Sequence, residues 1–265
     1  MLVWNNIRDD LVKLIEGERD SRLERERYDR FIQCCRMFQR VYQTWHTKQP
    51  NKHILPRAID LMRRIEVRAM VEQDNTQGNA EPDFKVFFDN FRVWSAEWKV
   101  ECDEKLRGLI RTSEAFKNEI PKDVDPLPLA SVVFTCLECS IKTSILEHIE
   151  MPPLYPEIMT HDCLYPEITD ESSIEDPYER AVVAVSKTAT SRKHTFWTCE
   201  KLTLETHWSK RMEKIITAFN KDPKTVTREE MDAVNDVRIS CYKCRPVPLD
   251  DMTWRNAVSR SHLPF

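Results

Sequence analysis

The strongest constraint on this chain is the presence of two Cys-x-x-Cys pairs. A histidine follows each pair, with 21 residues between Cys139 and His161 and 17 between Cys244 and His262. Two thiolates separated by two residues can hold one tetrahedral metal ion from a single tight turn, and Zn²⁺ sites are commonly closed by cysteine and histidine. Two structural zinc modules are therefore predicted. Their cysteine pairs are Cys136/Cys139 and Cys241/Cys244.

The first module contains a complete ligand set for one Zn²⁺. A Cys₃His set closes a tetrahedral site without a water ligand. In the alternative interpretation, the two cysteines of the pair are small buried hydrophobic residues beside an apolar strand. We predict the metal site. Its ligands are Cys136, Cys139, His161 and Cys163.

The second module is incomplete in the sequence, because Cys241, Cys244 and His262 provide only three ligands. Alternatively, both cysteine pairs share one Cys₄ site and leave the histidines free. Separate modules are favoured because each pair has its own downstream histidine. The fourth ligand would be water or a residue from elsewhere in the chain, such as His194, Cys199 or His207.

The composition is typical of a metal-binding protein inside the cell. The first ten residues contain two acids, whereas a secretory signal begins with basic and then continuously apolar residues, so we expect a cytoplasmic or nuclear location. Reducing compartments disfavour disulfides, and nine cysteines there indicate metal binding. No apolar run approaches the roughly 18 residues that span a bilayer, so no membrane partner is expected.

The sequence also excludes several activities. With only 3 glycines the chain cannot form a Gly-rich phosphate loop, and it lacks a G-x-S-x-G nucleophile elbow. The zinc-protease motif H-E-x-x-H is absent, and the deaminase combination of H-x-E with P-C-x-x-C is absent because no proline precedes either cysteine pair. We therefore predict that the protein is not an enzyme. Its net charge of −4 argues against nucleic-acid partners, which usually select a basic surface.

Apolar periodicity predicts a mostly α fold with a helical N-terminal half. Apolar residues recur at three- and four-residue steps from Ile7 to Trp45, which predicts one long helix or a broken pair that packs against other helices. A partner-binding coiled coil is the alternative for this segment. Further helices are predicted from Pro56 to about residue 73 and over 84–110. Residues expected in the core are Cys34, Cys35, Trp94, Trp98 and Cys102.

The pattern changes after a proline-rich linker that ends near residue 128. Residues 132–135 form a short β-prone run that leads into the first cysteine pair, and helices are predicted for 177–187 and 207–220. Thr227 and Glu230 match a capping box that opens another helix. These patterns predict a zinc-stabilised α+β C-terminal half. The predicted domains are a helical region, 1–120, and a zinc-binding region, 129–265.

Several segments resemble a set of F-box-type proteins of mushroom-forming (basidiomycete) fungi. The shared pattern is V-F-T-C-x-x-C, then Y-P-E-[IV]-x-x-H-x-C-L, then C-x-x-C followed by M-T-W-R-N-A-V-x-H. The last histidine of this pattern is replaced by Arg260, and His262 follows two residues later. The F-box module itself is not visible in the sequence. The matching segments are 133–139, 155–164, 227–232, 241–244 and 252–258.

The residues and the resemblance together indicate a non-enzymatic, zinc-stabilised interaction or scaffold protein whose partner is another protein. The resemblance further implies substrate recognition of the kind performed by F-box components of ubiquitin ligases. The alternative is a zinc-finger protein that binds nucleic acid. Two features argue against this alternative. The chain has a net negative charge, and it lacks a tight finger with about a dozen residues between a cysteine pair and a histidine pair.

Overall fold

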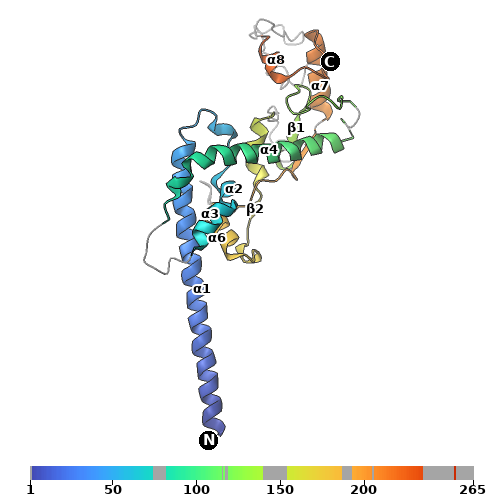
Figure 1. Ribbon diagram of the computed structural model, residues 1–265. Helices are drawn as coiled ribbons and strands as arrows, with labels where there is room; N and C mark the ends of the chain where they lie inside the picture. The colour runs from blue at the N-terminus through green and yellow to red at the C-terminus, as the bar shows by residue number, and fades with distance from the viewer. Residues whose placement is uncertain are drawn as a thin grey trace, which may run out of the picture. The chain divides into compact units, whose positions relative to one another are not determined.

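The fold is mostly helical, with two small antiparallel sheets in the C-terminal half of the chain (Figure 1). No strand occurs among the described residues before 115, which confirms the predicted helical N-terminal half. Within the described helices, none is long and apolar enough to cross a membrane. The structure is a computed structural model that describes residues 2–73, 82–114, 116, 119–139, 154–186, 193–204, 206–234 and 254, except for the side chains of 2–6 and 9.

Two compact units make up the fold, and each draws on two separate stretches of sequence. The division between them falls within the helix α4 (Phe88–Thr112). The division into these two units does not test whether the predicted regions 1–120 and 129–265 fold independently, so the predicted domain boundary stays a prediction. Unit 1 comprises Met1–Ala96 and Pro166–Phe196, and unit 2 comprises Glu97–Tyr165 and Trp197–Phe265.

The longest element of unit 1 is α1 (Leu2–His46), a single continuous helix (Figure 1). The second half of α1 buries one face at three- and four-residue steps, as the periodicity predicts. The buried residues are Phe31, Cys34, Cys35, Phe38 and Tyr42.

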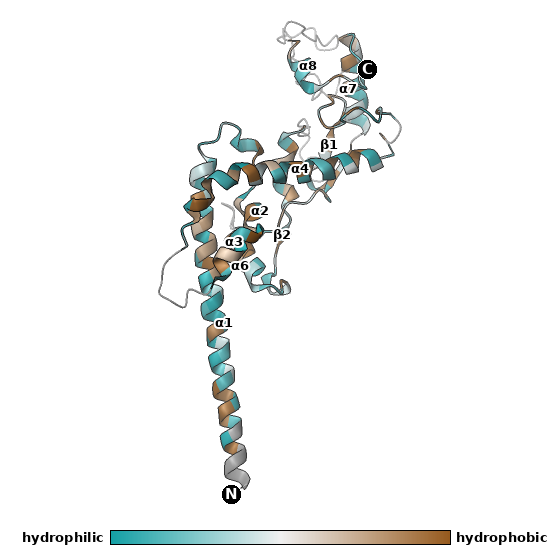
Figure 2. Ribbon diagram, viewed as in Figure 1, coloured by the Kyte–Doolittle hydropathy of each residue, from teal (hydrophilic) through white to brown (hydrophobic). Residues whose placement is uncertain are grey.

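The first half of α1 differs from the prediction, because its apolar side chains are exposed rather than packed. In Figure 2 brown apolar segments alternate with teal hydrophilic segments along the ribbon of this half. A helix of 45 residues extends about 65 Å, more than twice the diameter of a small domain, so one core cannot cover its full length. Its large apolar side chains that are between 46 and 66% exposed are Ile7, Leu11, Val12, Leu14, Ile15 and Leu23.

Aromatic side chains join α1 to the rest of unit 1. Phe38 meets the rings of Phe84 and Phe91 edge-on, with centroids 5.5 and 5.6 Å away. Tyr178 meets Phe31 in the same manner and donates a hydrogen bond from its hydroxyl to the Met62 carbonyl, 2.6 Å away. The elements around α1 are η1 (Lys52–Ile54), α2 (Ala58–Met62), α3 (Ile65–Glu72), η2 (Phe84–Phe87), η5 (Glu171–Ser173), α6 (Pro177–Val185) and the paired strands β2 (Glu167–Ile168) and β3 (Lys193–His194).

The helix predicted from Pro56 to about residue 73 is two helices, α2 and α3, separated at Arg63 and Arg64. The Met62 carbonyl at the end of α2 accepts the Tyr178 hydroxyl, and Arg64 adopts extended backbone with φ −62° and ψ 135°. Both short helices bury their apolar faces, with Leu61 and Val67 fully covered. The chain therefore turns between them to direct two short apolar faces into the unit 1 core.

Unit 2 contains the later part of α4 and the elements that carry the first cysteine pair. Strand β1 (Phe134–Cys136) pairs antiparallel with β4 (Leu202–Leu204), and α7 (Thr206–Ala218) follows. Along α4 the residues Trp98, Cys102, Leu106 and Ile110 are buried. All five residues predicted for the core are buried, namely Cys34, Cys35, Trp94, Trp98 and Cys102. A second buried cluster joins Ala130, Val133, Leu154, Met212, Ile215, Ile216, Val226, Met231 and Trp254.

Helix α8 (Arg228–Asp232) begins with the predicted capping box. The Thr227 hydroxyl accepts the Glu230 N–H at 3.2 Å, and the Glu230 carboxylate accepts the Thr227 N–H at 2.7 Å.

We expect Thr227→Ala to lower the free energy of unfolding by about 1 kcal/mol, because a helix N–H loses its acceptor. Chemical denaturation measures this change. Thr227→Ser retains the hydroxyl and is the control; an equal loss in both variants would contradict the capping role.

Candidate metal centre

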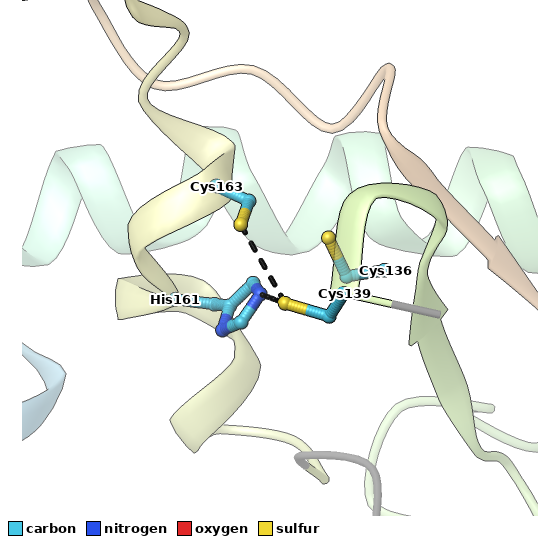
Figure 3. A group of neighbouring side chains, drawn as sticks. All are labelled: Cys136, Cys139, His161 and Cys163. Atoms are coloured by element: carbon cyan, nitrogen blue, oxygen red, sulfur yellow. Dashed lines mark hydrogen bonds between the residues drawn. The ribbon is translucent and has the colours of Figure 1, made fainter. Parts of the chain in front are cut away.

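Four side chains of unit 2 converge on one point, and they are the four predicted for the first module (Figure 3). The Cys139 sulfur lies 3.2 Å from His161 Nε2 and 3.6 Å from the Cys163 sulfur. The ligand atoms of all four side chains, including Cys136, lie within 4.8 Å of one another. The structure therefore contains a Cys₃His group that could bind a metal ion such as zinc.

The cysteine pair is placed by the β1–β4 sheet. Cys136 is the last residue of β1 and lies opposite Leu202, and the Leu137 N–H continues the pairing by donating to the Lys201 carbonyl at 2.9 Å. The Lys201 ammonium also pairs with the Glu138 carboxylate at 2.6 Å. The strand pairing thus fixes the start of the turn from which both thiols reach the cluster.

The histidine and the third cysteine come from two consecutive 3₁₀ turns. His161 ends η3 (Glu157–Thr160) and begins η4 (Asp162–Leu164), which contains Cys163. The tight 3₁₀ geometry brings two side chains separated by one residue toward the same cluster (Figure 3).

Hydrogen bonds to backbone carbonyls hold these two turns in place. The Trp197 indole N–H donates to the Met159 carbonyl at 2.7 Å, and the Thr198 N–H donates to the Leu164 carbonyl at 2.9 Å. Trp197 is buried, and its ring meets Trp98 of α4 edge-on. The turns are therefore positioned by residues far from the ligands in sequence.

The cluster combines one buried thiol with three partly accessible ligands. Cys136 is buried, whereas Cys139, His161 and Cys163 are half-buried, so a metal ion can reach them from solvent. Burial and the adjacent thiols raise the pKa of Cys163 to about 12, because the charged thiolate is disfavoured there. Metal binding at this cluster must therefore displace protons from thiols.

The donor set and spacing fit one Zn²⁺. Zn–S bonds near 2.3 Å and Zn–N bonds near 2.0–2.1 Å place tetrahedral ligand atoms about 3.5–3.8 Å apart. The separations of 3.2 and 3.6 Å, with all others below 4.8 Å, bracket these values, so small side-chain shifts complete the coordination. Thiolate and imidazole ligands are also those that zinc prefers.

The second predicted module, Cys241, Cys244 and His262, lies outside the described residues. Within the described part, the Cys₃His group is the one cluster of three or more metal-ligating side chains. His194 lies in β3 of unit 1, and neither Cys199 nor His207 belongs to that group. The described residues thus supply four candidate ligands for the first module, while the second zinc module stays a prediction.

One polar network near the centre was not foreseen from the sequence. Tyr155 donates a hydrogen bond to the Asp103 carboxylate at 3.1 Å, and Lys99 pairs with the same carboxylate at 2.7 Å and with the Tyr155 hydroxyl. Burial raises the pKa of Tyr155, so its hydroxyl stays a proton donor. This network anchors the chain six residues before His161 to α4. No local sequence pattern predicts this network, because Tyr155 and Asp103 are 52 residues apart.

Comparison of the chain with protein-family models, curated proteins and solved structures finds no match.

Proposed function

We propose that the protein is a non-enzymatic interaction or scaffold protein whose unit 2 is stabilised by one structural Zn²⁺. The observation that carries this proposal is the convergence of four protein ligand atoms, three sulfurs and one nitrogen. A tetrahedral Zn²⁺ held by four protein ligands has no position left for water or substrate, which is the arrangement of structural sites. The ion would cross-link the β1 turn to the 3₁₀ turns.

The interaction role is supported by the exposed first half of α1. Ile7, Leu11, Leu14 and Ile15 lie within nine residues on this half and are all exposed. Contiguous exposed apolar residues are typical of surfaces that contact other macromolecules. The resemblance to fungal F-box-type proteins adds substrate recognition within a ubiquitin ligase to the proposal, since two of the resembling segments supply all four ligands.

Metal titration tests the closed zinc site. We expect the wild-type chain to bind one more zinc than Cys136→Ser/Cys139→Ser, measured by elemental analysis. Each thiol ligand loses its proton, so we expect release of about three protons from this site near neutral pH and weaker binding as the pH falls. Calorimetry in buffers of different ionisation enthalpy measures the protons. Cys34→Ala removes a thiol of unit 1 that belongs to neither predicted metal site, so it should leave the zinc content unchanged.

Cobalt substitution separates a structural site from a catalytic one. In the wild-type chain reconstituted with Co²⁺, the absorption bands contributed by this site should indicate tetrahedral sulfur-rich coordination and should not change when azide is added. A shift of these bands with azide would reveal an open coordination position and would overturn the proposed non-enzymatic role. Comparison with Cys136→Ser/Cys139→Ser isolates the spectrum of this site.

A further inference from the structure

Charge is unevenly distributed along the chain, and one stretch stands out. Residues 30–59 contain six lysines and arginines and no acidic residue. Because the whole chain carries −4, the remaining residues carry −10. Residues 30–46 of α1 lie in this stretch, so a cationic segment forms part of an otherwise acidic protein.

The structure gathers part of this charge on the solvent-facing side of α1. A hollow of about 700 Å³ is lined by side chains from this helix and from the turn that follows it. Arg36 and Arg40 are one helical turn apart, about 6 Å along the axis, and Lys48 lies in the turn. The described lining residues are Arg36, Gln39, Arg40, Gln43, Thr44, Thr47 and Lys48.

These cations are exposed and not neutralised. Within the described part of the chain, no ion pair involves Arg36, Arg40 or Lys48. The opposite side of the same helix is anchored, because Phe38 is fully buried and the Tyr42 hydroxyl donates to the Pro56 carbonyl at 2.6 Å. The backbone that carries the cations is thus held in place before any partner arrives.

We propose that the face formed by α1 and the following turn, from Arg36 to Lys48, binds a short acidic segment of a partner protein. The inference rests on the proposed role as an interaction protein and specifies the chemistry of its partner. Arginine forms paired hydrogen bonds with carboxylates, and two arginines one turn apart match carboxylates at a similar spacing. The amides of Gln39 and Gln43 provide further donors between the cations.

Two observations favour an acidic peptide over nucleic acid. The described lining contains no aromatic ring on which a base could stack, and stacking contributes much of single-strand binding. A long polyanion would also extend beyond this short face toward a chain whose other residues carry −10, and like charges repel it there. A short acidic segment can satisfy the cations without that cost.

Fluorescence anisotropy with the full chain tests the proposal. The probe is a labelled glutamate-rich peptide, compared with the same peptide carrying glutamine at every glutamate. We expect the acidic peptide to bind, its affinity to fall with added salt, and Arg36→Glu/Arg40→Glu to weaken binding at least about tenfold. The matched control is Lys13→Glu/Arg19→Glu, which makes the same change in charge on the exposed first half of α1 and should change affinity less than about threefold.

Several outcomes would overturn this assignment. They are the absence of peptide binding, equal binding of the glutamine peptide, or an equal loss in the control variant. Tighter binding of an RNA or DNA oligonucleotide that is lost in Arg36→Glu/Arg40→Glu would reassign the face to nucleic acid. If the peptide does not bind while the cobalt spectrum indicates a closed site, the assignment of this face as a peptide-binding surface is wrong and the proposed function stands. A change of that spectrum with azide contradicts the proposed function independently of peptide binding.

Discussion

Removal of the metal, or the double substitution Cys136→Ser/Cys139→Ser, is expected to lower the melting temperature of unit 2 by about 10 °C or more. Zinc that binds only the folded form adds its binding free energy to folding, and this free energy is about 10–16 kcal/mol in isolated zinc-finger peptides. Typical net stabilities are roughly 5–15 kcal/mol, and each kcal/mol shifts melting by about 2–4 °C in a domain of this size. Differential scanning calorimetry of the zinc-loaded and chelated chain measures the shift.

Limited proteolysis should locate this destabilisation. New cleavage is expected in 134–139 and 154–164, because these segments carry the ligands and the ligand-bearing turns contain no long helix of their own. The second half of α1 and α6 should stay resistant, since aromatic contacts within unit 1 hold them. Residues 166–175 should stay resistant with them, because they belong to unit 1. Unchanged melting and unchanged cleavage after verified zinc removal would contradict the structural-zinc proposal.

Phe38→Ala is expected to destabilise unit 1 by about 3–5 kcal/mol. The Phe38 side chain is fully buried and contacts the rings of Phe84 and Phe91 edge-on, so truncation removes both apolar burial and two aromatic contacts. The surrounding rings come from separate elements, η2 and α4, and cannot collapse fully into the cavity. Urea unfolding followed by circular dichroism measures the loss.

Leu11→Ala is the matched control for this substitution. Leu11 lies on the same helix but is 52% exposed, so its truncation should change the free energy of unfolding by less than about 0.5 kcal/mol. A loss from Leu11→Ala as large as that from Phe38→Ala would show that the first half of α1 is buried in solution, most simply against a partner or a second copy. Sedimentation at several protein concentrations would then identify self-association.

The sequence alone determined the features that depend on local spacing. Steps of three and four residues predicted α1, α4, α6 and α7, because a helix brings such residues to one face whatever lies around it. The Thr227–Glu230 capping box was predictable for the same reason, since both hydrogen bonds close within one turn. The four side chains of the Cys₃His group were also predictable, because tetrahedral coordination requires a limited set of residue types in recognisable pairs.

Only the tertiary structure decided how distant segments are combined. The pairing of Phe134 with Leu204 joins residues 70 apart, and the Tyr178–Met62 hydrogen bond at the break between α2 and α3 joins residues 116 apart. The apolar pattern of α1 did not reveal that Phe31 would be buried and Leu11 exposed, because equal periodicity carries no information on which stretch a neighbour covers. Periodicity specifies a face of a helix, whereas burial depends on the partners that the whole fold brings to that face.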